Sequence, residues 1–307
     1  KVERPGFFDG QYGLAYVLDH FGHAEAATEQ LEQALSKTRQ LQSVNLHSGL
    51  AGAGLTLLHF GASRDDRQYL DEARQVADRI TAAVRSDEAH NIDHVVGPNG
   101  VILQQLGSQG GLLRGWSGPA LFLLRLYEHT GDSGYLDVAV EALHRYLRLC
   151  HPARDGSLQV NVGYAVLPYL NIGSAGIALV AAEALRHRAD EQLAEALPLL
   201  VRGCQPELVY EPHLFTGRAG LLATLARVAH LRSDLDLTGA IDRHLTRLSW
   251  HALAYRGQVT FPGTKLRRLS MDLGTGNAGV LLAITAAVDR QTSFLPFLEQ
   301  PALPVTA

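Results

Sequence analysis

Histidines stand just before two of the glycine motifs that recur along this chain. His213 lies four residues before Gly217 in EPHLFTG, and His47 lies two residues before Gly49. An imidazole titrates near neutral pH, so either side chain could act as a general base or a general acid. His213 is the stronger candidate for the base, with a solvent-exposed loop histidine as the alternative. For His47 the alternative is an ordinary neighbour of a helix cap.

Three further polar residues flank the same motifs. Tyr169, in LPYLNIG, could donate a hydrogen bond from its hydroxyl, or it could pack in the core. Asp272, in SMDLGTG, could orient a histidine, meet a peptide amine or cap its helix. Arg218, inside GRAG, is unusual at a buried helix start. It would suit an anionic oxygen or a backbone carbonyl, and an ion pair with Asp or Glu is the alternative.

The glycine motif itself is a repeat that runs through the chain. Six segments share one pattern: a small or polar residue, Gly, two residues, Gly, and then an apolar run. Their glycine pairs are Gly10 and Gly13, Gly49 and Gly52, Gly115 and Gly118, Gly173 and Gly176, Gly217 and Gly220, and Gly276 and Gly279. A helix that is hydrophobic all round, such as residues 280–284 (VLLAI) predict, must be buried all round. The repeat therefore predicts six inner helices.

Amphipathic stretches lie between these apolar runs and predict outer helices with one solvent-exposed face. Their apolar positions recur at steps of three and four, as in Tyr69, Ala73, Val76, Ile80 and Ala83, and in Leu136, Val140, Leu143, Leu147 and Cys150. The alternation of Val and Ile that is typical of strands is nearly absent. The sequence therefore predicts a mainly α fold, an α/α toroid in which a ring of inner helices is wrapped by outer helices.

The paired glycines need a physical reason, because Gly inside a helix costs about 1 kcal/mol relative to Ala. We expect them to let backbones approach closely at the helix starts, and to leave amide N–H groups open for a ligand beside the positive end of the helix dipole. The alternative is that the motif serves helix–helix packing alone.

Two stretches do not follow the alternation of inner and outer helices. Residues 86–114 are Gly-rich, and residues 256–275 carry Lys265, Arg267 and Arg268. Long loops in compact domains are often binding elements or lids. Gly97 and Gly100 mimic the repeat in the first stretch, but too few residues follow for an inner helix. No shift in composition marks a boundary, so residues 1–307 are expected to form a single domain.

Composition excludes several classes of protein. The net charge of −4 gives no electrostatic footprint for nucleic acid or an anionic membrane. No run approaches the roughly 20 apolar residues that span a bilayer. Two cysteines cannot build a disulfide framework, which favours a reducing cytoplasm. The start KVERPGFF has neither an initiator Met nor a signal peptide, so the chain is expected to be the remainder of something longer.

Four segments carry a resemblance to a known family: GWSGPALFLLRLYEHTGD (115–132), LPYLNIGSAGIALV (167–180), LFTGRAGLLATLA (214–226) and MDLGTGNAGVLLAI (271–284). They resemble the lanthionine synthetase C-like cyclase family. The closest likeness is to the C-terminal cyclase domain of class III lanthipeptide synthetases, which are lyase–kinase–cyclase fusions. The resemblance covers essentially the whole chain.

The resemblance implies an enzyme whose toroid adds Cys thiols to dehydroalanine or dehydrobutyrine in a ribosomal precursor peptide, made of a leader and a dehydrated core. The products are lanthionine or labionin rings. It also implies lyase and kinase domains of the same synthetase as partners, and seven inner helices where six motifs are visible here. The missing copy is expected to be an N-terminal one.

Zinc-dependent members of the family have WCYG and CHG motifs that supply Cys, Cys and His. Aligned on the glycines, those positions hold Asn171, Phe215 and Thr216, which are poor zinc ligands or none. The resemblance thus implies a metal-independent member. The dipeptide Cys150-His151 is interpreted as a buried thiol beside an exposed histidine at the end of an outer helix. His90 and His94 have no evident third ligand.

Thiol addition without a metal needs a base for the thiol (ordinary pKa about 8.5), stabilisation of the enolate and reprotonation of carbon. The candidates for these tasks are the polar residues at the starts of the inner helices, His213, Tyr169, Asp272, His47 and Arg218, helped by helix amides. Asn171, Thr216 and Asn277 would hold substrate amides. Trp116 would be a substrate platform, or would pack in the core.

Two other functions remain open at this point. A glycosidase needs two carboxylates roughly 5–9.5 Å apart, and Glu211 and Asp272 are the acidic residues near the later helix starts. The second alternative is a non-catalytic scaffold that holds the precursor peptide while its rings close unaided.

Overall fold

The computed structural model describes residues 4–86, 95–96, 102–103, 110–161, 166–289 and 293–298. His90, His94, Gly97 and Gly100 lie outside the described residues. The chain divides into two compact units, unit 1 (Lys1–Tyr146) and unit 2 (Leu147–Ala307). The expectation of a single domain over 1–307 stays a prediction.

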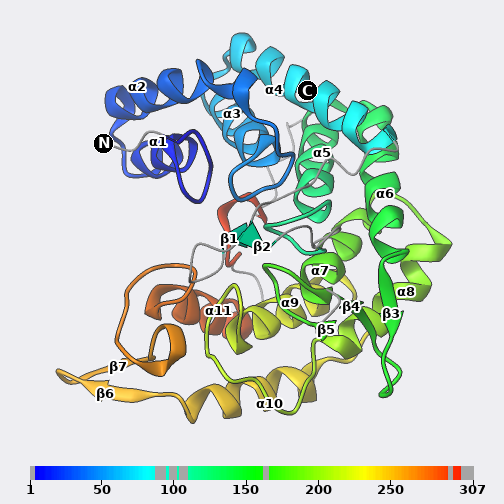
Figure 1. The fold of residues 1–307 in the computed structure, drawn as a ribbon, viewed down its shortest axis with the longest axis vertical. Helices are drawn as coiled ribbons and strands as arrows, with labels where there is room; N and C mark the ends of the chain where they lie inside the picture. The colour runs from blue at the N-terminus through cyan, green and yellow to red at the C-terminus, as the bar shows by residue number, and fades with distance from the viewer. Residues whose placement is uncertain are drawn as a thin grey trace. The chain divides into compact units, whose positions relative to one another are not determined.

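Each of the six glycine motifs begins a helix (Figure 1). These helices are α1 (Gln11–His20), α3 (Leu50–Arg64) and α5 (Ser117–Thr130) in unit 1, and α7 (Ser174–Ala184), α9 (Arg218–Leu231) and α11 (Asn277–Asp289) in unit 2. Within unit 1, α3 packs against α1 and α5, and within unit 2, α9 packs against α7 and α11. The predicted inner helices are therefore confirmed.

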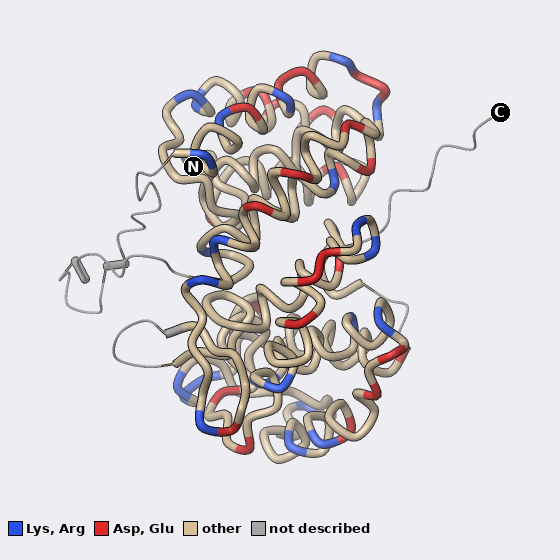
Figure 2. The backbone as a smooth tube through the Cα atoms, turned by 90° about the vertical axis from the view of Figure 1, so that its right-hand side faces the viewer, with Lys and Arg blue, Asp and Glu red and all other residues tan. Residues whose placement is uncertain are grey.

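The amphipathic stretches form the outer helices α2 (Ala24–Leu35), α4 (Arg67–Arg85), α6 (Ser133–Leu147), α8 (Glu191–Gly203) and α10 (Thr238–Ser249). Helix α4 buries Tyr69, Val76 and Ile80 on the face turned toward α3. Side chains of Asp66 and Asp190 cap α4 and α8, which satisfies backbone donors that a helix start leaves unpaired. Charged residues gather on the outer helices and the connecting loops (Figure 2).

The inner helices differ in how far they are buried. Every residue of α7 is buried, as a helix that is apolar all round requires. In α11, however, Leu281 and Leu282 are exposed, so the expectation that residues 280–284 are buried all round is wrong. The reason is local: in its own unit, α9 is the described helix that packs along α11, which leaves the opposite face of α11 uncovered.

Short antiparallel strands fill the connections: β1 (Val95–Val96), β2 (Ile102–Leu103), β3 (Cys150–Pro152), β4 (Leu158–Asn161), β5 (Val166–Leu167), β6 (Leu253–Tyr255) and β7 (Gln258–Thr260). Single turns of 3-10 helix lie at η1 (Thr38–Gln40), η2 (Thr264–Leu266) and η3 (Pro296–Leu298). Cys150 begins β3 and pairs with Val160, which corrects its placement at the end of an outer helix. Its side chain is buried and that of His151 is exposed, as expected.

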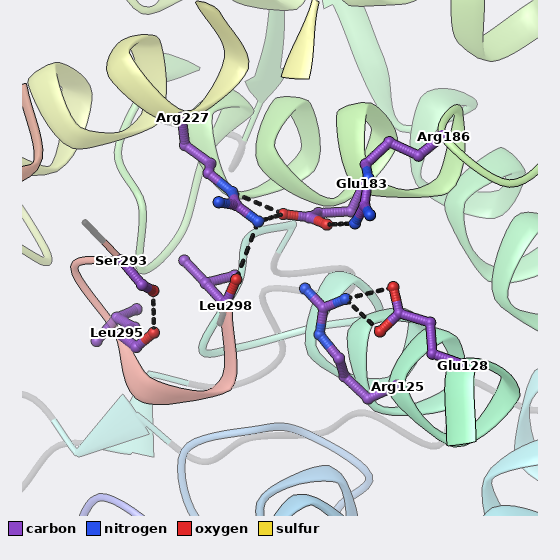
Figure 3. Close-up of polar contacts among 8 residues, drawn as sticks. All are labelled: Arg125, Glu128, Glu183, Arg186, Arg227, Ser293, Leu295 and Leu298. Carbon is purple, nitrogen blue, oxygen red and sulfur yellow. Dashed lines mark hydrogen bonds and ion pairs between the residues drawn. The ribbon is translucent and has the colours of Figure 1, made fainter. Parts of the chain in front are cut away.

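A buried charge cluster joins α7, α9 and the segment 293–298 in unit 2 (Figure 3). Glu183 is fully buried; its Oε1 accepts from Arg227 Nε (2.9 Å) and its Oε2 accepts from Arg186 Nη1 (3.0 Å). Arg227 Nη2 also donates to the carbonyl of Leu298 (2.9 Å). The cluster therefore ties the far ends of two inner helices to the segment that carries buried Phe294 and Leu298.

The start of each inner helix in unit 2 is held by the loop that precedes it. At α9 the N–H groups of Arg218, Ala219 and Gly220 donate to the carbonyls of Glu211, Pro212 and His213, each seven residues earlier, at 2.9, 3.1 and 3.3 Å. We call this arrangement the clasp. The same offset recurs in Gln11 to Arg4, Leu50 to Ser43, Ala175 to Pro168 and Asn277 to Ser270.

The clasp explains the two glycines of the motif and corrects one expectation. A Cβ on Gly217 would lie 2.3 Å from the carbonyl oxygen of Glu211, and one on Gly220 would lie 2.0 Å from that of Leu214. The glycines therefore admit the preceding loop against the helix. Because the first-turn amides of α9 are already paired with that loop, the expectation that they stay open for a ligand is wrong.

The Gly220→Ala variant is expected to be about 1–3 kcal/mol less stable than the parent chain, because the added methyl group forces the backbone of the loop away. Chemical denaturation followed by circular dichroism measures this difference. Gly239→Ala is the matched control, because Gly239 is exposed in α10 and its Cβ would meet only a side-chain atom of Arg243 at 3.5 Å. That variant should gain about 1 kcal/mol from helix propensity. Equal effects of the two substitutions would contradict the role of the clasp.

None of the helices in the described ranges is both long and apolar enough to cross a membrane.

Candidate functional site

Four of the predicted or neighbouring polar residues gather at the start of α9 in unit 2. Tyr169, Glu211, His213 and Arg218 belong to the loops before α7 and α9 and to the first residue of α9. Glu211 contacts His213 directly, and the charges of Glu211 and Arg218 both act on Tyr169. We call these four residues the α9 mouth.

His213 is placed by its own backbone and is fully buried, so the alternative of a solvent-exposed loop histidine is wrong. Its carbonyl accepts from Gly220 in the clasp. Nδ1 lies 2.9 Å from Glu211 Oε2, an ion-pair distance, although the ring is not aligned for a hydrogen bond. Nε2 has no partner in the part of the chain that the structure describes. A buried imidazole left without hydrogen bonds is costly, and such groups are frequent at functional sites.

Glu211 is the member of this pair that reaches solvent, with 18 % of its side chain exposed. Its other oxygen, Oε1, accepts from the backbone N–H of Lys265 at 2.8 Å. The pairing of Glu211 with His213 was missed from the sequence, where Glu211 stood only as a possible glycosidase carboxylate. The signal is present in EPH, because a residue before proline favours an extended backbone, and side chains two apart on an extended backbone point the same way.

Tyr169 is half-buried beside the pair. Burial raises the pKa of its hydroxyl, the negative charge of Glu211 raises it further, and the positive charge of Arg218 partly offsets both. The phenol therefore stays protonated at neutral pH and can donate a hydrogen bond.

Arg218 points toward the outer helix α10. Its Nη2 donates to the carbonyl of Glu207 at 3.2 Å, and its Nη1 lies 3.3 Å from Nδ1 of His244. Both contacts lie within the chain, and no ion pair of Arg218 with Asp or Glu is found among the described residues, so its catalytic role stays a prediction. Sequence reasoning did not single out His244. Arg218 fastens the start of α9 to α10 and to the α8–α9 loop.

His244 is locked as a neutral ring by its two neighbours. Nε2 lies 3.0 Å from the carbonyl oxygen of Cys204, so it donates there, and Nδ1 is left to accept from Arg218. Burial first, and then the charge of Arg218, lower the pKa of His244 to about 4. Protonating Nδ1 would place two donors face to face.

Acid is therefore expected to destabilise the fold through His244. The unfolded chain takes up a proton at this residue below pH of about 6.5, whereas the folded chain resists until about pH 4. Because the pKa of His244 is lower in the folded chain, the stability that the neutral ring contributes is fully present above about pH 6.5. This stability is lost as the pH falls from about 6.5 to about 4. Between pH 7 and 4.5 the parent should lose about 2–3 kcal/mol more than His244→Gln, whose amide can make both contacts without titrating. Urea unfolding at both pH values measures this, and equal losses would contradict it.

Asp272 and Asn277 hold the loop before α11. Asp272 Oδ1 accepts from the N–H of Thr275 (2.6 Å), and Oδ2 accepts from the hydroxyl of Ser270. Burial raises the pKa of Asp272, but these hydrogen bonds outweigh it and the net pKa is lowered. Asn277 Oδ1 accepts from the N–H of Phe261 (3.1 Å). No hydrogen bond or ion pair between Asp272 and a histidine is found among the described residues, so its catalytic role stays a prediction with little geometric support.

The loops before α7, α9 and α11 are joined through their backbones. The N–H of Asn171 donates to the carbonyl of Phe215 (2.9 Å), and the N–H of Phe215 donates to the carbonyl of Gly274 (3.2 Å). Asn171 Oδ1 is buried without a partner in the described ranges, and Thr216 is half-buried. These bonds bring Asn171, Thr216 and the α9 mouth to the same end of the inner helices, where a role in holding substrate amides stays a prediction.

Two predicted residues belong to unit 1 instead. Trp116 is buried, in agreement with the core-packing alternative, and Arg145 lies 6.0 Å from its ring. His47 is half-buried, and its N–H donates to the carbonyl of Leu113 at 3.0 Å. A surface hollow of about 630 Å³ in this unit is lined by Arg4, Gln33 and Lys37 among others, and none of the candidate residues lines it.

The residues present do not fit a family zinc site. Phe215 offers no ligand atom, and the carbonyl and hydroxyl oxygens of Asn171 and Thr216 are weak ligands beside thiolate or imidazole. Among the described residues, no three His, Cys, Asp or Glu side chains are grouped so that they could hold a metal. Cofactor independence of the chemistry stays a prediction.

Comparisons with known proteins show what the chain is similar to. No family model matches the chain. The probable SapB synthase of Streptomyces coelicolor is 37 % identical over 298 residues, which cover 96 % of this chain and 31 % of that protein. The resemblance to the lanthionine synthetase C-like family is confirmed. The chain spans about a third of the length of the curated relative it matches.

The chain is also similar to solved structures, of which the first named here supports the fold. An α-1,6-mannanase from Salegentibacter sp. HEL1_6 matches with a TM-score of 0.53 at 14 % identity, over 92 % of this chain and 90 % of that one. Nisin cyclase matches with a TM-score of 0.43 at 15 % identity, over 94 % and 66 %. The predicted fold class, mainly α with the helix pairing of an α/α toroid, is confirmed.

Proposed function

We propose that this chain is a metal-independent lanthipeptide cyclase domain, which adds Cys thiols to dehydroalanine or dehydrobutyrine in a precursor peptide. The observation that carries the proposal is the match to the probable SapB synthase along 96 % of the chain. The α9 mouth supplies acid–base groups of the kind this addition needs. Lyase and kinase domains of the same synthetase would prepare the dehydro residues, and the greater length of the relative is consistent with that arrangement.

The exposure of the Glu211–His213 pair suggests the order in which it would handle the thiol proton. Glu211 is the partly exposed member and His213 is buried behind it. A carboxylate facing the substrate can take the proton from the Cys thiol. The imidazole, 2.9 Å away, can receive this proton after the ring turns into hydrogen-bond alignment, which leaves an ion pair. The S–H bond is broken and the thiolate is free to attack Cβ of the dehydro residue.

Bond formation between sulfur and Cβ leaves an enolate that must be stabilised and quenched. The phenol of Tyr169 stays protonated, so it can donate to the enolate oxygen. Return of the proton from the imidazolium through Glu211 to Cα yields lanthionine. If the enolate carbon instead attacks Cβ of a second dehydro residue, a second enolate forms, and return of the same proton to its Cα yields labionin. Because Cys is already partly ionised near neutral pH, positioning of the peptide supplies a large share of the acceleration.

Ring closure of a pre-dehydrated peptide that contains Cys tests the proposal. Loss of the substrate thiol is followed by alkylation and mass spectrometry, with and without chelator. Burial raises the pKa of Cys150 and of Cys204 to about 12, so neither should consume the alkylating reagent in the folded protein. We expect closure well above the protein-free rate and independent of chelator.

A non-catalytic scaffold is the second candidate, favoured by the complete burial of His213. It predicts that a variant with Tyr169, His213 and Asp272 all substituted binds peptide more weakly but leaves ring formation intact. The enzyme predicts the reverse, so the two quantities measured on one variant separate the functions.

A further inference from the structure

An exposed apolar surface follows α10 in unit 2. We call residues 250–271 the hairpin face; it contains strands β6 and β7 and the η2 turn. Its large apolar side chains reach solvent, with exposed fractions of 71 % for Trp250, 63 % for Val259 and 69 % for Met271. Leu253, Tyr255, Leu266 and Leu269 are exposed as well. Large apolar side chains that are exposed together within one short segment indicate an interaction site.

The charge of the hairpin face is opposite in sign to that of the chain. It carries Arg256, Lys265, Arg267 and Arg268 and contains no Asp or Glu, whereas the whole chain has a net charge of −4. All four cations are exposed, and none of them forms an ion pair with a described residue. The guanidinium of Arg256 lies 5.2 Å from the ring of Tyr255, so a cationic group lies beside an apolar one. Leu253 and Tyr255 share one side of the hairpin, and Val259, which is paired with Ala254, lies on the other side.

The backbone of the hairpin face is also open to a partner. The β6–β7 pair is a sheet of two strands, so each strand is an edge, and the pair projects from unit 2 (Figure 1). Residues 252–259 are exposed without interruption. Strand edges pair with extended peptides, and an isolated two-stranded hairpin is only marginally stable in water.

The hairpin face borders the α9 mouth. The N–H of Lys265, within η2, donates to Glu211 Oε1 at 2.8 Å, and Phe261 at the end of the hairpin is buried and bonds to Asn277 in α11. A chain lying on the face would therefore pass next to the Glu211 carboxylate.

We propose that the hairpin face docks an extended peptide segment in which acidic and large apolar residues alternate. The proposal rests on the proposed function, because it describes a part of the precursor peptide that the site would modify. Charge complementarity selects acidic residues, and the exposed side chains select apolar ones. For a short peptide the four cations of the face outnumber the two carboxylates that border it, Glu211 and Asp272, and charges more than about 10 Å away are screened. An anionic membrane would instead meet the negative charge of the whole chain.

Fluorescence anisotropy with a labelled 15-residue peptide of alternating Glu and Leu or Phe tests this docking. The triple variant Arg256→Glu, Arg267→Glu and Arg268→Glu should bind at least about tenfold more weakly, with a reduced dependence on salt. Its matched control is Arg67→Glu, Arg74→Glu and Arg85→Glu on exposed positions of α4, which changes the net charge equally and should leave the affinity within about twofold. A variant with Trp250, Tyr255 and Val259 changed to Ser tests the apolar contribution and should also lose affinity.

Equal binding of the peptide by the hairpin variant and the α4 control would overturn the proposal, and so would equal binding of a Lys-for-Glu peptide. Binding to phosphatidylserine vesicles without peptide binding would overturn it in favour of a membrane contact. Ring closure on a short core peptide that lacks the acidic segment is measured in parallel. If rings close but the acidic peptide does not bind, the docking proposal is wrong and the proposed function stands. If the peptide binds but rings do not close, the proposed function is wrong and the docking proposal stands.

Discussion

The Glu211→Gln variant is expected to close thioether rings at least about 100-fold more slowly than the parent, measured as kcat/KM on a pre-dehydrated peptide. The amide keeps an oxygen that can accept from Lys265, so the loop should stay in place, but it cannot take a proton from the thiol. The fold is expected to be unchanged, because the clasp uses the backbone carbonyl of residue 211 and not its side chain.

Glu207→Gln is the matched control for this substitution. Glu207 lies in the same loop before α9, its carboxylate is exposed beside Arg247, and the bond from Arg218 uses its backbone carbonyl. This variant should cyclise at the parental rate. If Glu211→Gln also cyclises at that rate while binding peptide normally, the acid–base mechanism is wrong and the scaffold function is favoured.

The Glu183→Ala variant is expected to lose about 3–5 kcal/mol of stability, because it leaves the Arg227 guanidinium buried without its counter-charge. Arg186 is partly exposed and can turn to water, whereas only 8 % of the Arg227 side chain is exposed. Thermal and chemical unfolding measure the loss. Arg227 would also hold the carbonyl of Leu298 less firmly, so the segment 293–298 should show faster amide hydrogen exchange (Figure 3).

Asp234→Ala is the control that shows how much of the expected loss depends on burial of the ion pair rather than on its bond distances. Arg232 contacts Asp234 through two bonds of 2.8 and 2.7 Å, similar to those in the buried cluster, but 59 % of the Asp234 side chain is exposed. Its loss should cost no more than about 1 kcal/mol. Replacing Glu183 and Arg227 together by leucine should recover much of the loss seen for Glu183→Ala. A small effect of Glu183→Ala alone would show that the cluster does not stabilise unit 2.

The helices could be predicted from the sequence because their signals are local. A glycine pair followed by an apolar run recurs at each inner helix, and the outer helices show the three-to-four spacing of one buried face. Strands of two to four residues have no such signal, since alternation needs a longer run, and Cys150 was therefore placed in the wrong element. The exposure of Leu281 and Leu282 depends on which helix packs beside α11, and composition does not contain that information.

The candidate site could be predicted only in part. The position of His213 near a glycine pair was enough to single it out, and the structure adds its contact with Glu211. His244 could not be found, because it lies on an outer helix and meets Arg218 only when α9 and α10 pack together. Asp272 was assigned a catalytic role and Asn277 a substrate contact on position alone, and both make hydrogen bonds that support loops.

The constant offset of the clasp determines where this chain tolerates insertions and deletions. Seven residues separate each bonded carbonyl from its amide at α1, α3, α7, α9 and α11, while the first glycines of successive motifs are 39 to 66 residues apart. Length variation must therefore fall elsewhere, in the outer-helix turns and the hairpins. The heptapeptide that begins with Glu211 ends at Gly217 and includes His213, so it forms a segment of fixed length. Loops of that length can be exchanged between repeats to move acid–base groups from one helix start to another without changing the register of the helix.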